Sequence, residues 1–560
     1  MPDAHRPWLA HYPEGIDWHA RFHPRPFHAV LEDAAARYAD RPCIDFLDRQ
    51  TTYREVHDMT AKVARGLMDL GVGKGTKVGL FLPNCPYSVI CFFAILKAGG
   101  TVVNYNPLYV AREIEQQVVD SETEIMITLD LKLLLPKLEP LVDKGLLKAV
   151  VVARLADCLP FPKNYLYPWV KRDDIAKVPN QPAFLGFDRL IAGGGDIAPV
   201  PIDPERDIAL IQYTGGTTGI PKGAVHTHAS LVINAEQLAA WTHEFEAGGE
   251  RVLGVIPLFH VLAISTVLTF GIRTGAMLIL LPRFDLDQVL QTIHKKRPTF
   301  LPGVPTLFNA ISGHPEIDRF DLTSIKFCIS GGAPLPIEVK ETFERRAGCS
   351  LVEGYGLTEA PVTHCNPFHG LQKQGSFGLP MPGTTIEILS LEDGTTILPP
   401  GARGEVCISG PQVMKGYWRR PEETANALRS GRLHTGDIGY LDQDGYGFIV
   451  DRLKDLIICS GFNVYPRVVE EALYDHPAVL EAAVCGMPDA YRGETVKAYV
   501  VRREGAVLDE AGLLAFLKDR LSPIEMPKIV EFRAGLPKSA VGKILKKELL
   551  REERERAGAP

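Results

Sequence analysis

Short apolar runs alternate with amphipathic helical segments along most of the chain, and this alternation constrains the fold more than any other feature. Apolar side chains recur at helical spacing in residues 27–39, 51–70 (after a short strand) and 88–97. Buried-strand patterns stand at residues 77–82, 101–104, 124–128, 149–152, 276–281 and 324–329. Strands that alternate with helices predict βαβ units and a largely parallel sheet. We therefore expect an α/β fold.

Length and composition narrow the class further. The chain has 560 residues, which is too long for one core at roughly 100–200 residues per domain. Its net charge is −7, whereas a nucleic-acid-binding protein is usually basic, so we expect no nucleic-acid partner. The ten cysteines form no C-x-x-C pair, and residues 1–28 contain no apolar signal region. These features favour a cytoplasmic protein with reduced cysteines.

The pattern changes twice towards the C-terminus. Short strands at residues 386–389, 405–409 and 446–450 are separated by Gly, Pro and Asp turns, which favours a small antiparallel or barrel-like unit. After residue 452, helices at 468–473 and 510–521 flank strands at 482–485 and 497–501. This last block is long enough to form a separate α+β domain.

One segment is long enough to span a bilayer. Residues 252–272 carry no formal charge, but Gly254, Pro257 and His260 lie near the start of the segment. A transmembrane helix would place these groups in hydrocarbon at a cost, so we expect buried core.

A glycine- and threonine-rich stretch at residues 211–223 follows a buried strand. Its glycines let the backbone approach an anion closely, its hydroxyls can donate hydrogen bonds, and Lys222 adds positive charge. This combination suits the phosphates of a nucleotide. The stretch is not a Walker A loop, because no Ser or Thr follows a Gly-Lys pair. A surface turn is the simpler alternative.

The stretch resembles the phosphate-binding signature of the adenylate-forming superfamily, which includes acyl-CoA synthetases, peptide-synthetase adenylation domains and firefly-type luciferases. Segments that resemble the other signatures of the superfamily follow in the same order, at residues 257–260, 330–334, 354–359, 433–437, 451–455 and 537–543. Within the superfamily, residues 410–418 and 461–466 are most similar to bacterial long-chain fatty-acid–CoA ligases.

The resemblance implies a two-part architecture. A large N-terminal part, residues 1–452, would hold two parallel-type sheets with helices and a β-barrel-like unit at roughly 375–450. A small mobile α+β domain, residues 453–560, would follow, with its hinge at Lys454. A hinge residue must absorb a large change in φ and ψ.

The resemblance also assigns residues to the nucleotide. Tyr355 would stack on adenine, Asp437 would accept the ribose hydroxyls, and Glu359 would bind Mg²⁺ through a hard oxygen ligand. The residues assigned to ATP or AMP are Thr214, Gly215, Gly216, Thr217, Thr218, Gly219, Lys222, Gly331, Gly332, Ala333, Gly354, Tyr355, Gly356, Leu357, Thr358, Asp437, Arg452 and Lys543. The catalytic set would be Lys543, His260, Glu359 and Thr358, with Lys543 neutralising the transition state at the α-phosphate.

The remaining assignments concern the acyl group and CoA. The CoA side would include Ser460, Gly461 and Phe462, and the acyl pocket would include Phe259, Leu262, Gly303, Val304 and Leu307. We expect ATP-dependent activation of a fatty acid to acyl-AMP and pyrophosphate, then transfer of the acyl group to CoA.

Several alternatives stay open at this point. The acid could be medium-chain, aromatic or dicarboxylic, in which case Arg251 or Arg273 could supply the distal cation. Loading of a carrier protein, a non-catalytic nucleotide-binding module and an oxygenase of the luciferase type are further alternatives. A homodimer and a loose association with the inner face of the membrane are also left open as partners.

Overall fold

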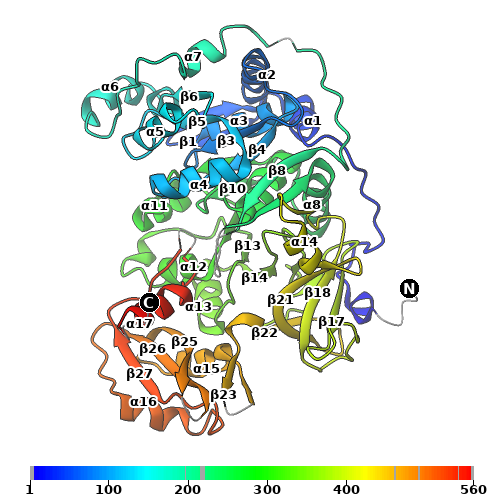
Figure 1. Ribbon diagram of the computed structural model, residues 1–560, viewed down its shortest axis with the longest axis vertical. Helices are drawn as coiled ribbons and strands as arrows, with labels where there is room; N and C mark the ends of the chain where they lie inside the picture. Colours follow the sequence, from blue (N-terminus) through cyan, green and yellow to red (C-terminus); the bar gives the residue numbers. More distant parts are fainter. Residues whose placement is uncertain are drawn as a thin grey trace.

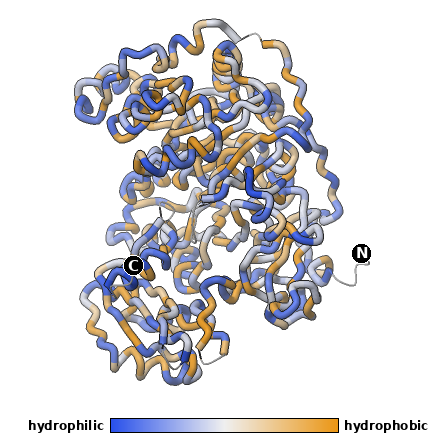
Figure 2. The backbone as a smooth tube through the Cα atoms, in the orientation of Figure 1, coloured by the Kyte–Doolittle hydropathy of each residue, from blue (hydrophilic) through white to orange (hydrophobic). Residues whose placement is uncertain are grey.

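The computed structural model describes residues 6–195, 197–214, 221–459, 462–489, 492–539 and 542–556, and every structural statement below concerns these residues. The α/β class predicted from the sequence is confirmed: two large, mainly parallel sheets carry helices, and two smaller sheets follow them in the chain (Figure 1). Apolar segments concentrate in the interior strands, as Figure 2 shows.

The first large sheet has β3 (Lys77–Phe81) near its centre. In the part of the chain that the structure describes, its order is β19-β9-β8-β4-β3-β5-β6-β7, with β8 and β9 antiparallel. The other strands are β4 (Thr101–Asn104), β5 (Thr123–Leu129), β6 (Ala149–Ala153), β7 (Phe184–Gly186), β8 (Ile208–Tyr213), β9 (Gly223–Thr227) and β19 (Gly416–Tyr417).

The second large sheet runs in the order β16-β15-β14-β13-β12-β10-β11-β1-β2 over the described residues. Its strands are β1 (Pro42–Phe46), β2 (Arg49–Thr52), β10 (Arg251–Gly254), β11 (Met277–Leu280), β12 (Phe300–Gly303), β13 (Phe327–Ser330), β14 (Ser350–Tyr355), β15 (His364–Cys365) and β16 (Leu379–Pro380). The predicted strand at 324–329 therefore begins later, because residues 323–324 form a turn before β13.

The two smaller sheets hold the C-terminal strands. The third sheet is antiparallel and contains β17 (Thr385–Leu389), β18 (Gly404–Ser409), β20 (Leu428–Arg429), β21 (Arg432–Leu441) and β22 (Gly447–Arg452). The fourth contains β23 (Ile457–Cys459), β24 (Phe462–Val464), β25 (Val479–Asp489), β26 (Gly493–Arg502) and β27 (Ile529–Arg533). Residues of the fourth sheet and its helices form hydrophobic cores of their own.

Helices cover the sheets. The α-helices are α1 (Ala29–Tyr38), α2 (Tyr53–Asp69), α3 (Pro86–Lys97), α4 (Ala111–Ser121), α5 (Glu139–Asp143), α6 (Lys163–Val170), α7 (Phe187–Leu190), α8 (His228–Trp241), α9 (Val261–Ala263), α10 (Phe270–Thr274), α11 (Leu286–Lys296), α12 (Pro305–Ser312), α13 (Ile337–Ala347), α14 (Pro421–Ala427), α15 (Pro466–Tyr474), α16 (Glu510–Leu517) and α17 (Lys546–Arg556). The shorter helical segments are η2 (Pro7–His11), η3 (Leu135–Lys137), η4 (Leu155–Cys158), η5 (Ile264–Thr269), η6 (Ile317–Arg319) and η7 (Leu453–Asp455).

The long apolar segment at 252–272 is buried core, as predicted. It is divided among β10, a loop, α9, the π-helical η5 and α10, and most of its side chains are buried. None of the helices in the described ranges is both long and apolar enough to cross a membrane.

Helix α2 shows how local sequence and packing combine. The Thr52 hydroxyl accepts a hydrogen bond from the Glu55 backbone N–H, and the Glu55 carboxylate in turn accepts one from the Thr52 backbone N–H, so the first turn is capped. At the other end Gly66 lies against α7, where a Cβ would overlap the backbone carbonyl oxygen of Leu190. The backbone of α7 cannot yield as a flexible side chain would.

We predict that Gly66→Ala destabilises the protein by about 2–4 kcal/mol, although alanine is the better helix former. The expected readout is a melting temperature lower by several degrees in differential scanning fluorimetry. Gly73→Ala is the matched control, because a Cβ at Gly73 meets no atom within 4 Å. Equal melting temperatures for the two variants would show that α7 moves aside without cost.

Candidate active site

The site is built where three parallel strands end. Gly303 of β12, Ser330 of β13 and Glu353 of β14 are partners in register, so the loops that follow these strands emerge at one edge of the sheet. The loop after β13 is tied to the end of β12, since Gly331 N–H donates to the Gly303 carbonyl at 3.1 Å. Ligands in open α/β sheets bind at such carboxyl ends.

Two glycines in these loops are required by geometry. Gly332 has φ of +78°, a left-handed conformation that favours glycine. At Gly356 a Cβ would lie 2.7 Å from the backbone nitrogen of Val362. The predicted nucleotide residues Gly331, Gly332 and Ala333 therefore form one narrow loop, whereas Gly354 and Tyr355 end β14, and Gly356 and Leu357 begin the loop that follows it.

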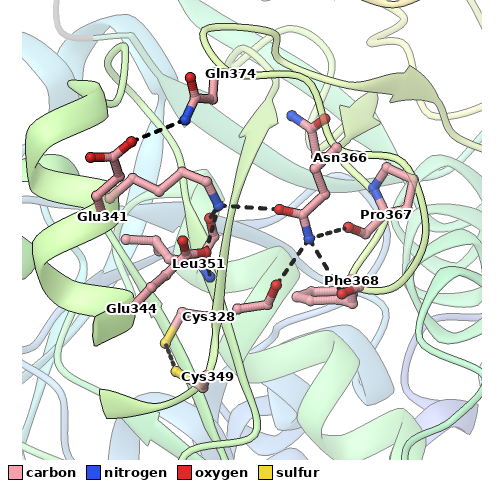
Figure 3. A network of polar contacts seen from close by, with 12 residues as sticks. Cys328, Glu341, Glu344, Cys349, Leu351, Asn366, Pro367, Phe368 and Gln374 are labelled. Atoms are coloured by element: carbon pink, nitrogen blue, oxygen red, sulfur yellow. Dashed lines mark hydrogen bonds and ion pairs between the residues drawn. The ribbon is translucent and has the colours of Figure 1, made fainter. Parts of the chain in front are cut away.

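Figure 3 shows a polar network that links α13 to β14 and to the loop after β15. The Lys340 ammonium on α13 donates to the Leu351 carbonyl at 2.7 Å and to Gln372 Oε1 at 3.1 Å. The Gln372 amide in turn donates to Ser350 Oγ at 2.9 Å and to the Pro367 carbonyl at 3.0 Å. These bonds hold α13, β14 and the loop after β15 in one arrangement.

A polar cluster at the end of β14 joins Tyr355, Asp437 and Arg452. The Tyr355 hydroxyl donates to Asp437 Oδ2 at 2.6 Å, and Arg452 Nε lies 3.0 Å from Asp437 Oδ1. Burial and the Asp437 carboxylate raise the pKa of Tyr355, and the same carboxylate raises the pKa of Arg452. The Phe377 ring packs on Tyr355 at a centroid distance of 4.7 Å. The structure thus brings together three predicted residues from two sheets, Tyr355 from the second large sheet and Asp437 and Arg452 from the third.

The part of β21 before Asp437 is braced from β18. Gly436 N–H donates to Glu405 Oε1 at 3.1 Å, and His434 Nδ1 lies 2.8 Å from Glu405 Oε2. Glu405, Cys407 and His434 are ligand types that suit Zn²⁺. However, an Arg429 guanidinium nitrogen lies 2.7 Å from the same His434 nitrogen, so the cluster already includes a cation, and we interpret it as bracing this part of β21.

Thr358 and Glu359 are held by two residues that sequence reasoning assigned no role. The Tyr417 hydroxyl donates to Glu359 Oε1 at 2.6 Å, and His226 Nε2 lies 2.7 Å from the Thr358 carbonyl oxygen. Burial lowers the pKa of His226 to about 4, so the ring is neutral and its Nε2–H donates. The family resemblance covers Tyr417. Its role, however, could not be predicted from local sequence, because its partner Glu359 lies 58 residues away in the chain.

The glycine-rich stretch is described only at its ends. Gly215, Gly216, Thr217, Thr218 and Gly219 lie outside the described residues. At the base of the stretch, Thr214 N–H donates to the Lys222 carbonyl at 2.9 Å, and Lys222 Nζ lies 5.2 Å from the centroid of the Tyr417 ring. Asp120 anchors the preceding strand by accepting the Tyr213 hydroxyl at 2.6 Å.

Lys543 reaches this site from the C-terminal part. Gly542 lies so close to Thr306 on α12 that a Cβ would overlap the Thr306 hydroxyl oxygen. Burial, and then the charge of Arg452, lower the pKa of Lys543 to about 8. Asp437, Lys454 and Asp455 also act electrostatically on Lys543, so its ammonium lies within electrostatic range of the Asp437–Arg452 pair.

The imidazole of His260 is neutral and lies within electrostatic range of Lys543. Burial, and then the charge of Lys543, lower the pKa of His260 to about 4. Its Nδ1 accepts the Leu262 backbone N–H at 3.3 Å, which assigns the ring proton to Nε2. A neutral imidazole with a free Nε2–H can donate to a carboxylate.

The predicted acyl residues divide into two groups. Leu262 and Val304 border the glycine loop, because Cβ atoms at Gly331 and Gly332 would lie 3.3 Å and 3.8 Å from them. The second group lies further from the glycine loop. Gly303 lies against Leu307, which is buried in the hydrophobic core that includes α12. The Phe259 carbonyl oxygen accepts a hydrogen bond from the Gln212 side-chain amide at 2.9 Å.

Phe462, predicted for the CoA side, and the two arginines considered as a distal cation lie outside the cluster described above. Phe462 is exposed on β24, and Ser460 and Gly461 lie outside the described residues. Arg251 donates to the Lys296 carbonyl at 2.9 Å, at the start of β10 rather than at its carboxyl end. Arg273 pairs with Glu236 at 2.7 Å. These contacts weigh against a dicarboxylate pocket built on Arg251 or Arg273.

Comparison with known proteins identifies the arrangement. A model of the AMP-binding enzyme family matches residues 31–418, and a model of the AMP-binding enzyme C-terminal domain matches residues 468–543. The chain belongs to the AMP-binding enzyme family. It is an adenylate-forming enzyme of the acyl-CoA ligase type, as the resemblance predicted, and the family uses ATP.

Individual relatives agree over almost the whole chain. A long-chain-fatty-acid–CoA ligase of Bacillus subtilis is 46% identical over 558 residues, with 99% of each chain covered. The crystal structure of an anthranilate CoA ligase in complex with anthranoyl-AMP superposes with a TM-score of 0.85 at 25% identity, covering 97% of this chain and 100% of that one. ATP-bound MatB from Rhodopseudomonas palustris gives a TM-score of 0.80 at 29% identity, covering 95% and 99%.

The lowered pKa of Lys543 predicts an alkaline limit on adenylation. Lys543 loses its positive charge as the pH rises through about 8, so kcat/KM for pyrophosphate exchange should fall above that pH, by up to about tenfold per pH unit. In the Lys543→Arg variant the side chain keeps its charge at high pH. Its pH profile of kcat/KM should therefore show no fall above about pH 8, even if its rate is lower at every pH. An alkaline limb that persists in the arginine variant would assign it to another group.

Proposed function

We propose that the enzyme activates a long-chain fatty acid with ATP and transfers it to CoA, and that Lys543 acts in the first step. The single observation that carries this proposal is that Gly542, next to Lys543, packs against Thr306 at the start of α12, the helix that follows β12 and begins at the edge of the sheet where the site is built. The fatty-acid class is supported by the similarity to the Bacillus subtilis ligase.

In the first step the protein positions ATP against the carboxylate. Asp437 accepts the ribose hydroxyls, Tyr355 stacks on one face of adenine with residues 331–333 against the other face, and the stretch at 214–222 holds the phosphates. His260 donates its Nε2–H to the fatty-acid carboxylate, which keeps that group pointed at the α-phosphorus. The Lys543 ammonium stabilises the negative charge that grows on the α-phosphate in the transition state.

The donor set beside Thr358 fits a hard divalent cation. Glu359 offers carboxylate oxygens, and its hydrogen bond from Tyr417 fixes the orientation of the carboxylate. We propose that Glu359 binds Mg²⁺, which, when bound, neutralises phosphate charge and orients the pyrophosphate leaving group.

The second step needs a different arrangement of the C-terminal part. We propose that residues 453–560 form a domain that turns about Lys454 after acyl-AMP has formed, so that Lys543 leaves and CoA enters near residues 460–462. The separate hydrophobic cores of this part support a unit that can move as a body. We further propose that the enzyme acts in the cytoplasm, in keeping with its ten free cysteines.

An aromatic acid is the second candidate substrate. It is favoured by the similarity to the anthranilate CoA ligase structure. The test is CoA- and ATP-dependent release of AMP over a series of acids from acetate to stearate, with benzoate and anthranilate added. A kcat/KM that rises with chain length supports the proposal, and a maximum at an aromatic acid replaces it with the second candidate.

We predict that Lys543→Ala separates the two half-reactions. Pyrophosphate exchange should fall by a factor of about 100 or more, since a charge at the transition state is lost, while thioester formation from supplied acyl-AMP changes by less than about threefold. Lys538→Ala is the matched control, because Lys538 lies in the same segment and pairs with Glu481 instead. Unchanged exchange in Lys543→Ala would remove Lys543 from the mechanism.

A second prediction tests the contact that places Lys543. Gly542→Ala introduces a Cβ that overlaps the Thr306 hydroxyl at a φ of +77°, so pyrophosphate exchange should fall by about tenfold or more. Adding Thr306→Ala removes the clash but not the backbone strain, and should restore part of the rate. If the double variant is no faster than Gly542→Ala, the contact with α12 does not limit adenylation.

A further inference from the structure

One carboxylate on α4 joins that helix to two distant segments of the chain. Asp120 is the second-last residue of α4 (Ala111–Ser121), and its side chain is 18% exposed. Its Oδ2 accepts the Tyr213 hydroxyl at 2.6 Å, and its Oδ1 accepts a guanidinium N–H of Arg420 at 2.6 Å. These partners lie 93 and 300 residues away in the chain. Both carboxylate oxygens are therefore used to connect separate parts of the protein.

These contacts fix both ends of the glycine-rich stretch. Tyr213 is the last residue of β8 and directly precedes residues 214–222. At the other end, the Gly223 carbonyl accepts the Trp418 backbone N–H at 2.7 Å. The Trp418 indole N–H in turn donates to the Asp120 backbone carbonyl at 3.1 Å. The entrance and the exit of the stretch are thus tied to the same residue of α4.

The same contacts place the side chain that holds Glu359. Tyr417, whose hydroxyl donates to Glu359 Oε1 at 2.6 Å, lies directly before Trp418 in the chain. Trp418 and Arg420 both bond to Asp120, so the backbone on which Tyr417 stands is fixed from α4. Residues that hydrogen-bond to a metal ligand set its orientation. Asp120 therefore acts on Glu359 through Tyr417.

Neighbouring contacts hold this segment firmly. Arg419 has φ of +52°, a left-handed conformation that L side chains seldom adopt, and it pairs with Glu122 at 2.5 Å. Glu122 also pairs with Lys77 at 3.2 Å, and the Lys77 ammonium lies 4.6 Å from the centroid of the Trp418 ring. A strained backbone conformation persists only where its surroundings determine it. The end of α4 and residues 418–420 therefore form one rigid contact.

We propose that Asp120 is a positioning residue for the β- and γ-phosphates of ATP and for the divalent cation that accompanies them. Both of its carboxylate oxygens already accept hydrogen bonds from side chains, so it acts through the glycine-rich stretch and through Tyr417 rather than by contact with ATP. The inference rests on the proposed function where that function assigns the phosphates to residues 214–222 and Mg²⁺ to Glu359. It involves neither the fatty acid nor CoA, so nucleotide binding alone can test it.

The test compares two nucleotides on the full-length enzyme. ATP carries the β- and γ-phosphates and AMP lacks them, whereas both carry the adenosine that Tyr355 and Asp437 would bind. Asp120→Ala should raise the dissociation constant of ATP with Mg²⁺ by about tenfold in isothermal titration calorimetry, because two hydrogen bonds to a carboxylate are lost. The dissociation constant of AMP should change by less than about twofold. A residue that only maintains the fold would weaken the binding of both nucleotides.

Further variants separate the individual contacts. Asp120→Asn keeps the shape and one acceptor oxygen but loses the charge, so the dissociation constant of ATP should rise by only about threefold. Tyr213→Phe should weaken ATP binding in the wild type but not in Asp120→Ala, where the partner of the hydroxyl is already absent. Glu115→Ala is the matched control, because Glu115 lies on the same helix and pairs with Lys144 at 2.7 Å instead. It should bind both nucleotides as the wild type does.

Two outcomes would overturn the inference: equal weakening of ATP and AMP binding in Asp120→Ala, or effects of Asp120→Ala and Tyr213→Phe that add in the double variant. If Asp120→Ala does not fold, Asp120→Asn and Tyr213→Phe carry the same comparison of ATP with AMP. The proposed function can fail separately. An enzyme that activates no fatty acid but shows the ATP-specific loss refutes only the proposed function, and a fatty-acid ligase whose Asp120 variants bind ATP normally refutes only the inference.

Discussion

Parallel pairing of β12, β13 and β14 is the constraint on which the whole site depends. Because Gly303, Ser330 and Glu353 are in register, the chain must leave the sheet three times at the same edge. The loops there have little room, and the hydrogen bond from Gly331 to Gly303 holds two of the strand ends together. Small residues are needed for such a close approach, so the glycine motifs follow from the register.

The other parts of the molecule bring charge to this edge. Asp437 and Arg452 are cross-strand partners of β21 and β22, so backbone pairing alone sets the carboxylate opposite the guanidinium. Tyr355 from β14 then joins this pair to the second large sheet through one hydrogen bond. Arg452 is also the last residue of β22, directly before η7. The ion pair therefore anchors the chain at the point where it passes to the C-terminal sheet.

Much of this could be predicted from the sequence, for a physical reason. Buried strands and their glycine turns leave local patterns, so β3, β4 and β6 were predicted within a residue or two, and signature residues such as Asp437 and Lys543 were predicted through family resemblance. The supporting residues leave no such pattern. Tyr417 meets Glu359 across 58 residues, and His226 meets Thr358 across 132. Only the packed fold reveals these partners. The lengths of β25 and β26 were also underestimated, because their polar ends break the apolar run.

The electrostatics of Lys543 suggest why one arrangement would not persist through both half-reactions. This lysine is partly buried within electrostatic range of Arg452 and Lys454, and both desolvation and these charges lower its pKa to about 8. Placing an ammonium there therefore costs free energy, which a bound polyphosphate offsets through attraction. Once pyrophosphate has left, less negative charge remains to hold the lysine. Withdrawal of Lys543 would then relieve its desolvation and its repulsion from Arg452, so the chemistry of the first step would itself favour the rearrangement proposed for the second step.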